Sequence, residues 1–227
     1  MLGSDDILAL VWPGARGSEV QTVLDQWNRV LDARDNYSGL HSTLATRYAL
    51  MLGRRLPLPP KEMAALWVSG HVYDLGKIAV PEHILTKEGA LTDAEMMMVR
   101  THVSMGHDLL RDWAMLRGGP RWLYKTVLDV VLYHHERWDG NGYLHGRRGS
   151  DIPSLARVMA IADTYAAMIL DTPYRKAKSE AQALRELEEN AGAQFDPYLL
   201  HQFLSAVRLA QNVPHLGSHP ATDLSAA

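Results

Sequence analysis

The sequence contains no cysteine among its 227 residues, which excludes disulfide bonds and thiolate metal sites. It also lacks any stretch close to the roughly 18 consecutive apolar residues that a membrane-spanning helix needs. Residues 1–13 have neither the basic segment nor the long apolar core of a secretory leader. Because the absence of cysteine also fits a reducing compartment, we expect a soluble, cytoplasmic protein that does not enter a membrane.

A large excess of charge of one sign is missing too, since the formal net charge at pH 7 is -3. This argues against broad electrostatic binding to a nucleic-acid polymer or to an anionic membrane, while a local basic pocket for phosphate stays compatible with it. The length, with 47% hydrophobic and 22% charged residues, is that of one well-buried globular domain.

Strand-like alternation, internal repeats, low-complexity tracts and glycine-rich nucleotide motifs are absent from the chain. Apolar residues instead recur with the period of an amphipathic helix, as in the segment from Val20 to Leu31. The stripe in that segment belongs either to the core or to an interface with a second copy. Periodicity alone therefore predicts an all-α protein.

Two adjacent histidines, His134 and His135, follow an apolar segment that ends at Tyr133. Neighbouring residues on a helix point about 100° apart, so both imidazoles could reach one metal ion, or a metal ion and a substrate. Gly140 and Gly142 then mark two tight turns. A pair of histidines alone is equally compatible with side chains that bind nothing.

The surrounding motifs make the pair more informative. In chain order they are Asp35-x-Tyr37-Ser38-x-x-His41, Asp74-Leu75-Gly76-Lys77, His102-x-x-x-Gly106, His134-His135-Glu136, Asp139-Gly140-x-Gly142-Tyr143 and Asp163. This series resembles the HD-GYP domain family over residues 35–205. The resemblance implies an all-α, HD-type helical bundle with a metal site at its centre. We assign it to residues 35–210, between an N-terminal extension with one amphipathic helix (1–34) and a flexible tail (211–227).

The resemblance also implies two metal positions. One would hold Asp74, His102, His134 and His135, and the other would hold His41, Asp163 and the same Asp74 as a bridge. Imidazole and carboxylate ligands suit divalent Fe or Mn. On pattern alone His41 is a core histidine, and Asp163 has a salt bridge to Arg157 as its alternative.

The activity that the resemblance implies is hydrolysis of cyclic di-GMP by a metal-bound hydroxide, giving pGpG with GMP as a further product. Besides the catalytic Asp74, Lys77 would offset negative charge near the scissile phosphate. Tyr143 would stack on or hydrogen-bond the ligand. Arg175 would contact phosphate, unless it is only a solvated surface arginine. Glycine at residue 106, four residues after His102, would let another element approach that histidine closely.

The chain departs from the family pattern at several positions. Leu144 replaces a proline, which should loosen its loop, and Thr172 replaces an arginine, which removes one phosphate contact. Tyr37 stands where some relatives have a glutamate for a third metal, so two metals are the expected number. In the motif that names the family, Tyr73 replaces the histidine before Asp74.

Three consequences of Tyr73 compete. A phenol with a pKa near 10 coordinates only a strong Lewis acid, so one metal position would be weakened or lost. His71 could substitute, since it lies three residues before Asp74 and would share its helix face. The fold could also be kept for binding alone. The leading hypothesis is a cyclic di-GMP phosphodiesterase, and the alternative is a degenerate domain that binds nucleotide or a signalling partner. A homodimer stays open.

A capping box, Thr92-x-x-Glu95, predicts the start of a further helix. Three consecutive methionines, residues 96–98, follow it. We expect them to serve as adaptable filling of the core rather than as a methionine surface.

Overall fold

The computed structural model describes residues 17–35, 37–113, 118–171 and 176–211. Within these residues the regular elements are helical, apart from one isolated bridge between Ala191 and Phe195, so the all-α prediction is confirmed. In chain order the elements are α2 (Gly17–Asp35), α3 (Ser38–Arg55), α4 (Pro60–Val72), η1 (Leu75–Ala79), α5 (Glu82–Leu85), α6 (Asp93–Arg100), α7 (His102–Arg111), α9 (Arg121–Tyr133), η2 (Gly149–Asp151), α10 (Ser154–Ile169), α11 (Glu180–Glu189) and α12 (Pro197–Gln211).

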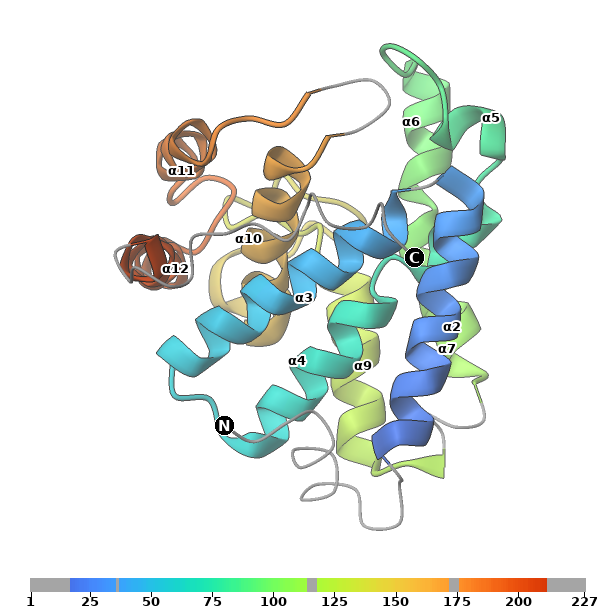
Figure 1. The fold of residues 1–227 in the computed structure, drawn as a ribbon, viewed down its shortest axis with the longest axis horizontal. Coiled ribbons are helices and arrows are strands. Elements are labelled where there is room, and N and C mark those ends of the chain that lie inside the picture. Colours follow the sequence, from blue (N-terminus) through green and yellow to red (C-terminus); the bar gives the residue numbers. More distant parts are fainter. Residues whose placement is uncertain (1–16, 36, 114–117, 172–175, 212–227) are drawn as a thin grey trace, which may run out of the picture.

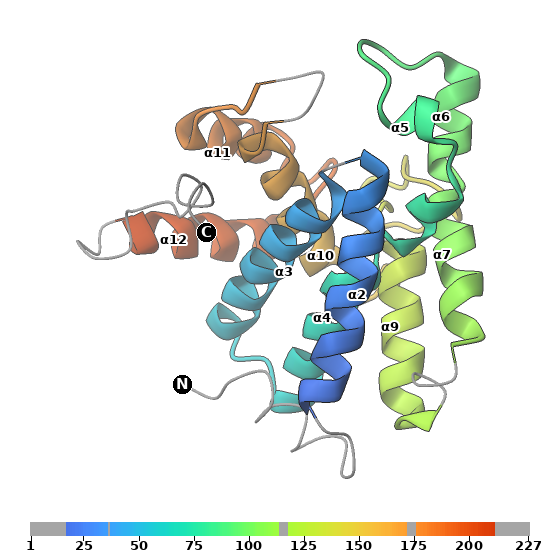
Figure 2. The same ribbon diagram turned by 45° about the vertical axis from the view of Figure 1, so that its right-hand side comes forward.

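The bundle is built around α3, α4, α9 and α10 (Figures 1 and 2). Helix α3 crosses both α4 and α10, and α7 packs along α9. Helices α11 and α12 lie on one side of α10, whereas α5 and α6 project at the opposite corner. None of the described helices is long and apolar enough to span a membrane. The cytoplasmic location stays a prediction.

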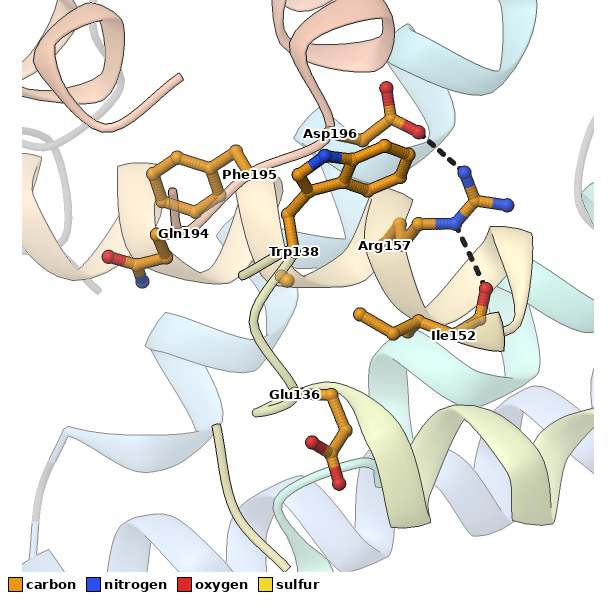
Figure 3. A pocket seen from close by; sticks show the side chains of 8 residues that line it. Glu136, Trp138, Ile152, Arg157, Gln194, Phe195 and Asp196 are labelled. Carbon is orange, nitrogen blue, oxygen red and sulfur yellow. Dashed lines mark hydrogen bonds and ion pairs between the residues drawn. The ribbon is translucent and has the colours of Figure 1, made fainter. Parts of the chain in front are cut away.

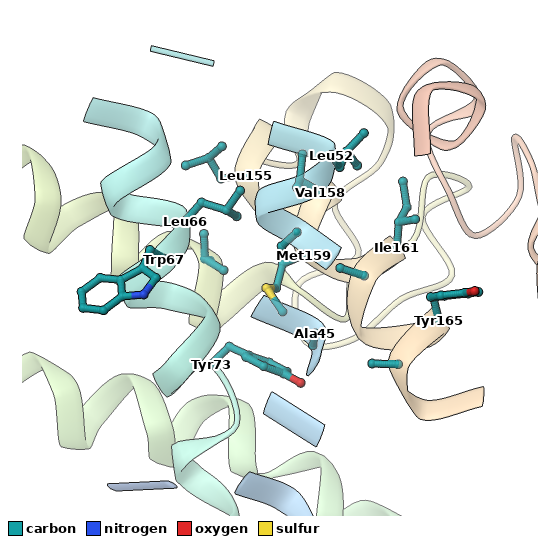
Figure 4. Close-up of a cluster of buried hydrophobic side chains, with 14 of the residues drawn as sticks. Ala45, Leu52, Leu66, Trp67, Tyr73, Leu155, Val158, Met159, Ile161 and Tyr165 are labelled. Atoms are coloured by element: carbon teal, nitrogen blue, oxygen red, sulfur yellow. The ribbon is translucent and has the colours of Figure 1, made fainter. Parts of the chain in front are cut away.

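Helix α10 is largely buried, because it is apolar around most of its circumference. Its Met159 and Tyr165 side chains lie among those of the neighbouring helices, including Leu52 of α3 and Leu66 of α4 (Figure 4). The Tyr73 ring, which follows α4, belongs to the same cluster. Packing on all sides holds α10 in place, so a functional group on it has a fixed position.

Helix α2 forms part of this core. Val20, Leu24 and Leu31 are buried, and Trp27 packs against the same cluster. Of the two roles that were open for this stripe, these residues take the core role, whereas Val30 is exposed. The domain boundary at residue 35 stays a prediction, although the apolar face of α2 is completed by the rest of the bundle.

The three methionines of α6 do not fill the core, and that prediction is wrong. The capping box is present, because the Thr92 side chain accepts a hydrogen bond from Glu95 N and the Glu95 side chain accepts one from Thr92 N. However, Met96, Met97 and Met98 are all exposed, and α6 has no buried residue. Three consecutive helical residues span about 200°, so at most part of such a run can face a neighbour.

We predict that Leu24→Ala lowers the free energy of unfolding by about 2–5 kcal/mol, because the cavity would open inside the main core. Urea denaturation of the full chain measures this change. Val30→Ala, on the exposed side of the same helix, is the matched control and should cost about 0.5 kcal/mol or less. Equal, small losses for both variants would show that α2 is not integral to the fold.

Candidate metal centre

Asp74 lies where α4 ends and the chain turns. The helix stops at Val72, Tyr73 caps it, and Asp74 leads into the tight turn of η1. The Asp74 side chain is only 2% exposed, and its Oδ2 accepts a hydrogen bond of 2.8 Å from Lys77 Nζ. Burial opposes the charge, but Lys77, followed by His102 and His134, holds the pKa of Asp74 below its usual value. The carboxylate is therefore ionised at neutral pH.

Two glycines allow η1 to lie directly against α7. A Cβ atom on Gly76 would be 1.8 Å from the carbonyl oxygen of His102 and 2.5 Å from the amide nitrogen of Gly106. On the other side of the contact, Gly106 faces the backbone of Gly76, as its spacing from His102 predicted. This approach places His102 Nε2 3.3 Å from Asp74 Oδ1.

His102 and His134 are oriented by the backbone. Their Nδ1 atoms donate to the carbonyl oxygens of Val99 (2.7 Å) and Val131 (2.9 Å), respectively. Because a carbonyl only accepts, Nδ1 carries the proton and Nε2 offers its lone pair to the site. The two Nε2 atoms are 3.5 Å apart.

Burial lowers the pKa of the histidines in this cluster. The pKa of His102 falls to about 4, and the pKa values of His134 and His135 are also lowered. The three imidazoles are therefore neutral at pH 7, which is the form that binds a metal ion. Together with Asp74, each of them offers one ligand atom, and these four atoms lie within 4.8 Å of one another.

A second cluster shares Asp74 and adds His41 from α3 and Asp163 from α10. One ligand atom of each residue again lies within 4.8 Å of the others. His41 Nε2 is 2.8 Å from Asp163 Oδ1 and 4.0 Å from Asp74 Oδ2. The structure thus brings together the residues of each of the two groups that the sequence analysis proposed, with Asp74 in both. The alternative of a salt bridge between Asp163 and Arg157 is wrong, because Arg157 pairs with Asp196 at 2.5 Å.

Tyr73 points into this second cluster from the core. Its ring is fully buried, and its hydroxyl donates a hydrogen bond of 2.8 Å to Asp163 Oδ1. Burial, followed by the negative charges of Asp163 and Asp74, raises the pKa of Tyr73 well above its usual value. The phenol is therefore protonated, and it acts on Asp163 as a donor.

His71 does not substitute for the missing histidine, so this option is wrong. Its Nδ1 lies 2.8 Å from the carbonyl oxygen of Trp67, and its ring packs on the Trp67 ring. It belongs to neither of the ligand clusters found among the described residues. The argument from a shared helix face fails because α4 ends at Val72, before Asp74.

A cavity of about 190 Å³ opens beside the first cluster. It is lined by Arg100, His134, His135, Glu136, Arg137, Asn141, Gly142, Tyr143, Ala160, Thr164 and Gln194. The Tyr143 ring stacks on the His135 ring with 4.8 Å between centroids, and the Arg100 guanidinium carbon is 4.9 Å from the Tyr143 centroid. Burial raises the pKa of Tyr143, so its hydroxyl stays protonated.

The loop that carries Tyr143 is anchored to the segment before α12. The amide nitrogens of Trp138 and Asp139 donate to the carbonyl oxygens of Gln194 (3.1 Å) and Ala193 (2.8 Å). Beside this contact the Arg157 guanidinium bonds Asp196 and lies 5.6 Å from the centroid of the Trp138 ring, around a second, far smaller cavity (Figure 3). Whether Leu144 loosens the loop stays a prediction.

The sequence analysis also singled out Tyr37, Thr172 and Arg175. The Tyr37 hydroxyl lies 3.3 Å from His41 Nδ1, and its ring stacks on that imidazole. Arg175 and Thr172 lie outside the described residues. Sequence reasoning missed Arg100, because no motif of the series includes it and only the folded chain brings its guanidinium to the Tyr143 ring and the cavity.

A family model described as an HD domain matches residues 23–199. Since this match covers most of the chain, the protein belongs to the HD domain family. Within that family it is a member of the HD-GYP group, as the ordered motifs predicted.

The relatives with curated names are bacterial. A cyclic di-GMP phosphodiesterase of Pseudomonas aeruginosa is 38% identical over 177 residues, which are 78% of this chain and 41% of the relative. A cyclic di-GMP phosphodiesterase response regulator of Xanthomonas campestris is 32% identical over 77% of this chain and 44% of its own length. A 3'3'-cGAMP-specific phosphodiesterase of Vibrio cholerae is 30% identical over 77% of this chain and 32% of its length. The chain thus spans less than half of each.

Solved structures share the fold. An HDG"Y"P protein from Bdellovibrio bacteriovorus aligns with a TM-score of 0.58 and 16% identity, over 74% of this chain and 51% of that one. The HD domain of a Listeria monocytogenes phosphodiesterase, in complex with cyclic-di-AMP, aligns with a TM-score of 0.56 and 13% identity, over 86% of this chain and 99% of that one. At these identities the likeness concerns the fold alone.

We predict that Gly76→Ala moves η1 away from α7 and separates Asp74 from His102, because the added Cβ would overlap backbone atoms. The free energy of unfolding should fall by about 1–3 kcal/mol, and Mn(II) binding measured by titration calorimetry should weaken. Gly118→Ala is the control, since its added Cβ meets no atom within 4 Å. Unchanged metal binding in Gly76→Ala would contradict the link between this contact and the site.

Proposed function

We propose that the chain is a metal-dependent phosphodiesterase that hydrolyses cyclic di-GMP to pGpG, with GMP as a further product. One observation carries the proposal: a buried, ionised Asp74 is shared by two groups of ligand atoms beside a cavity with arginines in its wall. The relatives named as cyclic di-GMP phosphodiesterases support the substrate. The relative named for 3'3'-cGAMP is 30% identical and the Pseudomonas relative named for cyclic di-GMP is 38% identical, so cyclic di-GMP is the first choice.

The donor set fits divalent metal ions such as Fe or Mn. His102, His134 and His135 present neutral imidazoles, and Asp74 and Asp163 present carboxylates, a mixture that hard oxygen-binding cations and structural zinc sites seldom use. Two positions would be filled, with Asp74 as their common ligand and His41 completing the second. Bound there, the ions would supply Lewis acidity toward water and phosphate.

The remaining residues act on charge and position. Lys77 keeps Asp74 ionised through their 2.8 Å contact, and its ammonium adds positive charge beside the site. Tyr143 stays protonated, so its hydroxyl can donate to a phosphate oxygen, while its ring holds His135 in place. Arg175 keeps its proposed role as a phosphate contact. A homodimer or a signalling partner stays a prediction.

The first experiment is elemental analysis of anaerobically purified protein beside a cyclic di-GMP hydrolysis assay supplemented with Fe(II) or Mn(II). We expect turnover in the wild type and a loss of at least about 100-fold in Asp74→Asn, since both metal positions lose their common charge. Asp129→Asn, whose carboxylate pairs with Lys125 on an exposed part of α9, should retain full activity. Absence of turnover with every metal would overturn the proposal.

Tyr73 favours a second candidate function, binding of a cyclic dinucleotide without hydrolysis. Its hydroxyl donates a hydrogen bond to Asp163, and tyrosine at this position offers no imidazole ligand. The second metal position should therefore be the weaker one. We predict that Tyr73→His tightens the weaker Mn(II) site at least about tenfold in a calorimetric titration, by adding a ligand.

Tyr73→Phe, which removes the hydroxyl without adding a ligand, is the control and should leave the stronger site unchanged. Two equally tight sites in the wild type would contradict the asymmetry. A wild type that binds cyclic di-GMP but shows no turnover, together with an active Tyr73→His, would establish the binding function instead.

A further inference from the structure

Arg100 has no role in the motifs that identify the site, yet it lines the cavity. It is the last residue of α6, two positions before His102. Its guanidinium carbon lies 4.9 Å from the centroid of the Tyr143 ring, and that ring stacks on His135. A column of three side chains thus leads from a candidate metal ligand to an exposed cation at the cavity wall.

The other cations near the site are engaged by carboxylates. Lys77 donates to Asp74. Arg137, which also lines the cavity, makes two hydrogen bonds with Asp139, of 3.1 and 2.8 Å, and one with the Gln194 side chain. Among the described residues, no carboxylate lies within ion-pair distance of Arg100. Its guanidinium packs on the face of the Tyr143 ring instead. Its hydrogen-bond donors are therefore available to an anion.

We propose that Arg100 binds a non-bridging phosphate oxygen of the cyclic dinucleotide, and that Tyr143 holds the guanidinium in place for this contact. The inference rests on the proposed function and deepens it by assigning a phosphate ligand. A cation–π contact restrains an arginine while leaving its donors free, and the planar guanidinium matches the geometry of phosphate oxygens.

The test compares Arg100→Met, which keeps an unbranched apolar stem and removes the charge, with Arg100→Lys, which keeps the charge and loses the planar fork. Arg111→Met on α7 is the control, because Arg111 is an exposed arginine that pairs with Asp108 and does not line the cavity. Each full-chain variant is titrated with cyclic di-GMP, cyclic di-AMP, 3'3'-cGAMP and bis(p-nitrophenyl) phosphate at low and high salt. Melting temperature and Mn(II) content are measured on the same samples.

We expect Arg100→Met to weaken binding of every phosphodiester that the wild type binds by about tenfold or more, with a smaller salt dependence. Arg100→Lys should recover part of this loss. Melting temperature and metal content should match those of Arg111→Met, because α6 packs little against the bundle.

The outcomes separate the two proposals. Wild-type turnover of cyclic di-GMP with unchanged affinity in Arg100→Met overturns the role of Arg100 and leaves the proposed function intact. Preference for another cyclic dinucleotide with the expected loss in Arg100→Met overturns the substrate and supports Arg100. If the loss comes with a lowered melting temperature or metal content, and lysine recovers nothing, the role is structural. A wild type that binds none of the four compounds overturns both.

Discussion

The buried carboxylate of Asp74 is the charge on which the site depends, because both groups of ligand atoms include it. An isolated carboxylate in this position would be too costly to keep ionised. Lys77 offsets one charge through a direct hydrogen bond, and the imidazoles of His102 and His134 are neutral because burial lowers their pKa values. Burial opposes the charge of Asp163 as well, but the hydrogen bond with His41 holds its pKa below the usual value, so a second carboxylate lies at the centre, where divalent cations would balance the pair.

The position of Asp74 depends in turn on a backbone contact. The ligand side chains come from several elements: α3, the turn before η1, α7, the end of α9, and α10. A small displacement of any one of these elements would separate the ligand atoms. The tightest of these approaches is that of η1 to α7, where Gly76 and Gly106 leave no room for a side chain. Two residues without functional groups thus control the distance between Asp74 and His102.

The ligand clusters could be predicted from the sequence because the ordered motifs resemble the HD-GYP family. Helical periodicity alone predicted His41 as a core histidine and left the role of His134 and His135 open. The errors concern tertiary contacts that spacing does not determine. His71 shares a face with Asp74 only if α4 continues, and the helix ends at Val72, two residues before Asp74. Met96 to Met98 lie on a predicted helix, but that helix, α6, has no buried residue, so the three side chains stay exposed. Arg100 gains its place from a loop more than 40 residues away in sequence.

Tyr73 is uncharged, as a neutral histidine at this position would be, but it donates a hydrogen bond where the histidine would offer a lone pair. A neutral imidazole would offer a lone pair to a metal ion, whereas the protonated phenol donates its hydrogen to Asp163 Oδ1, which also contacts His41. The proposed second metal position would therefore have one ligand fewer, and one lone pair of Asp163 accepts the Tyr73 hydrogen bond. A metal ion that binds there must displace a hydrogen bond to a charged group, worth about 1.5–3 kcal/mol net, which is small beside the attraction between a divalent cation and two buried carboxylates. We therefore expect the substitution to weaken this position without closing it.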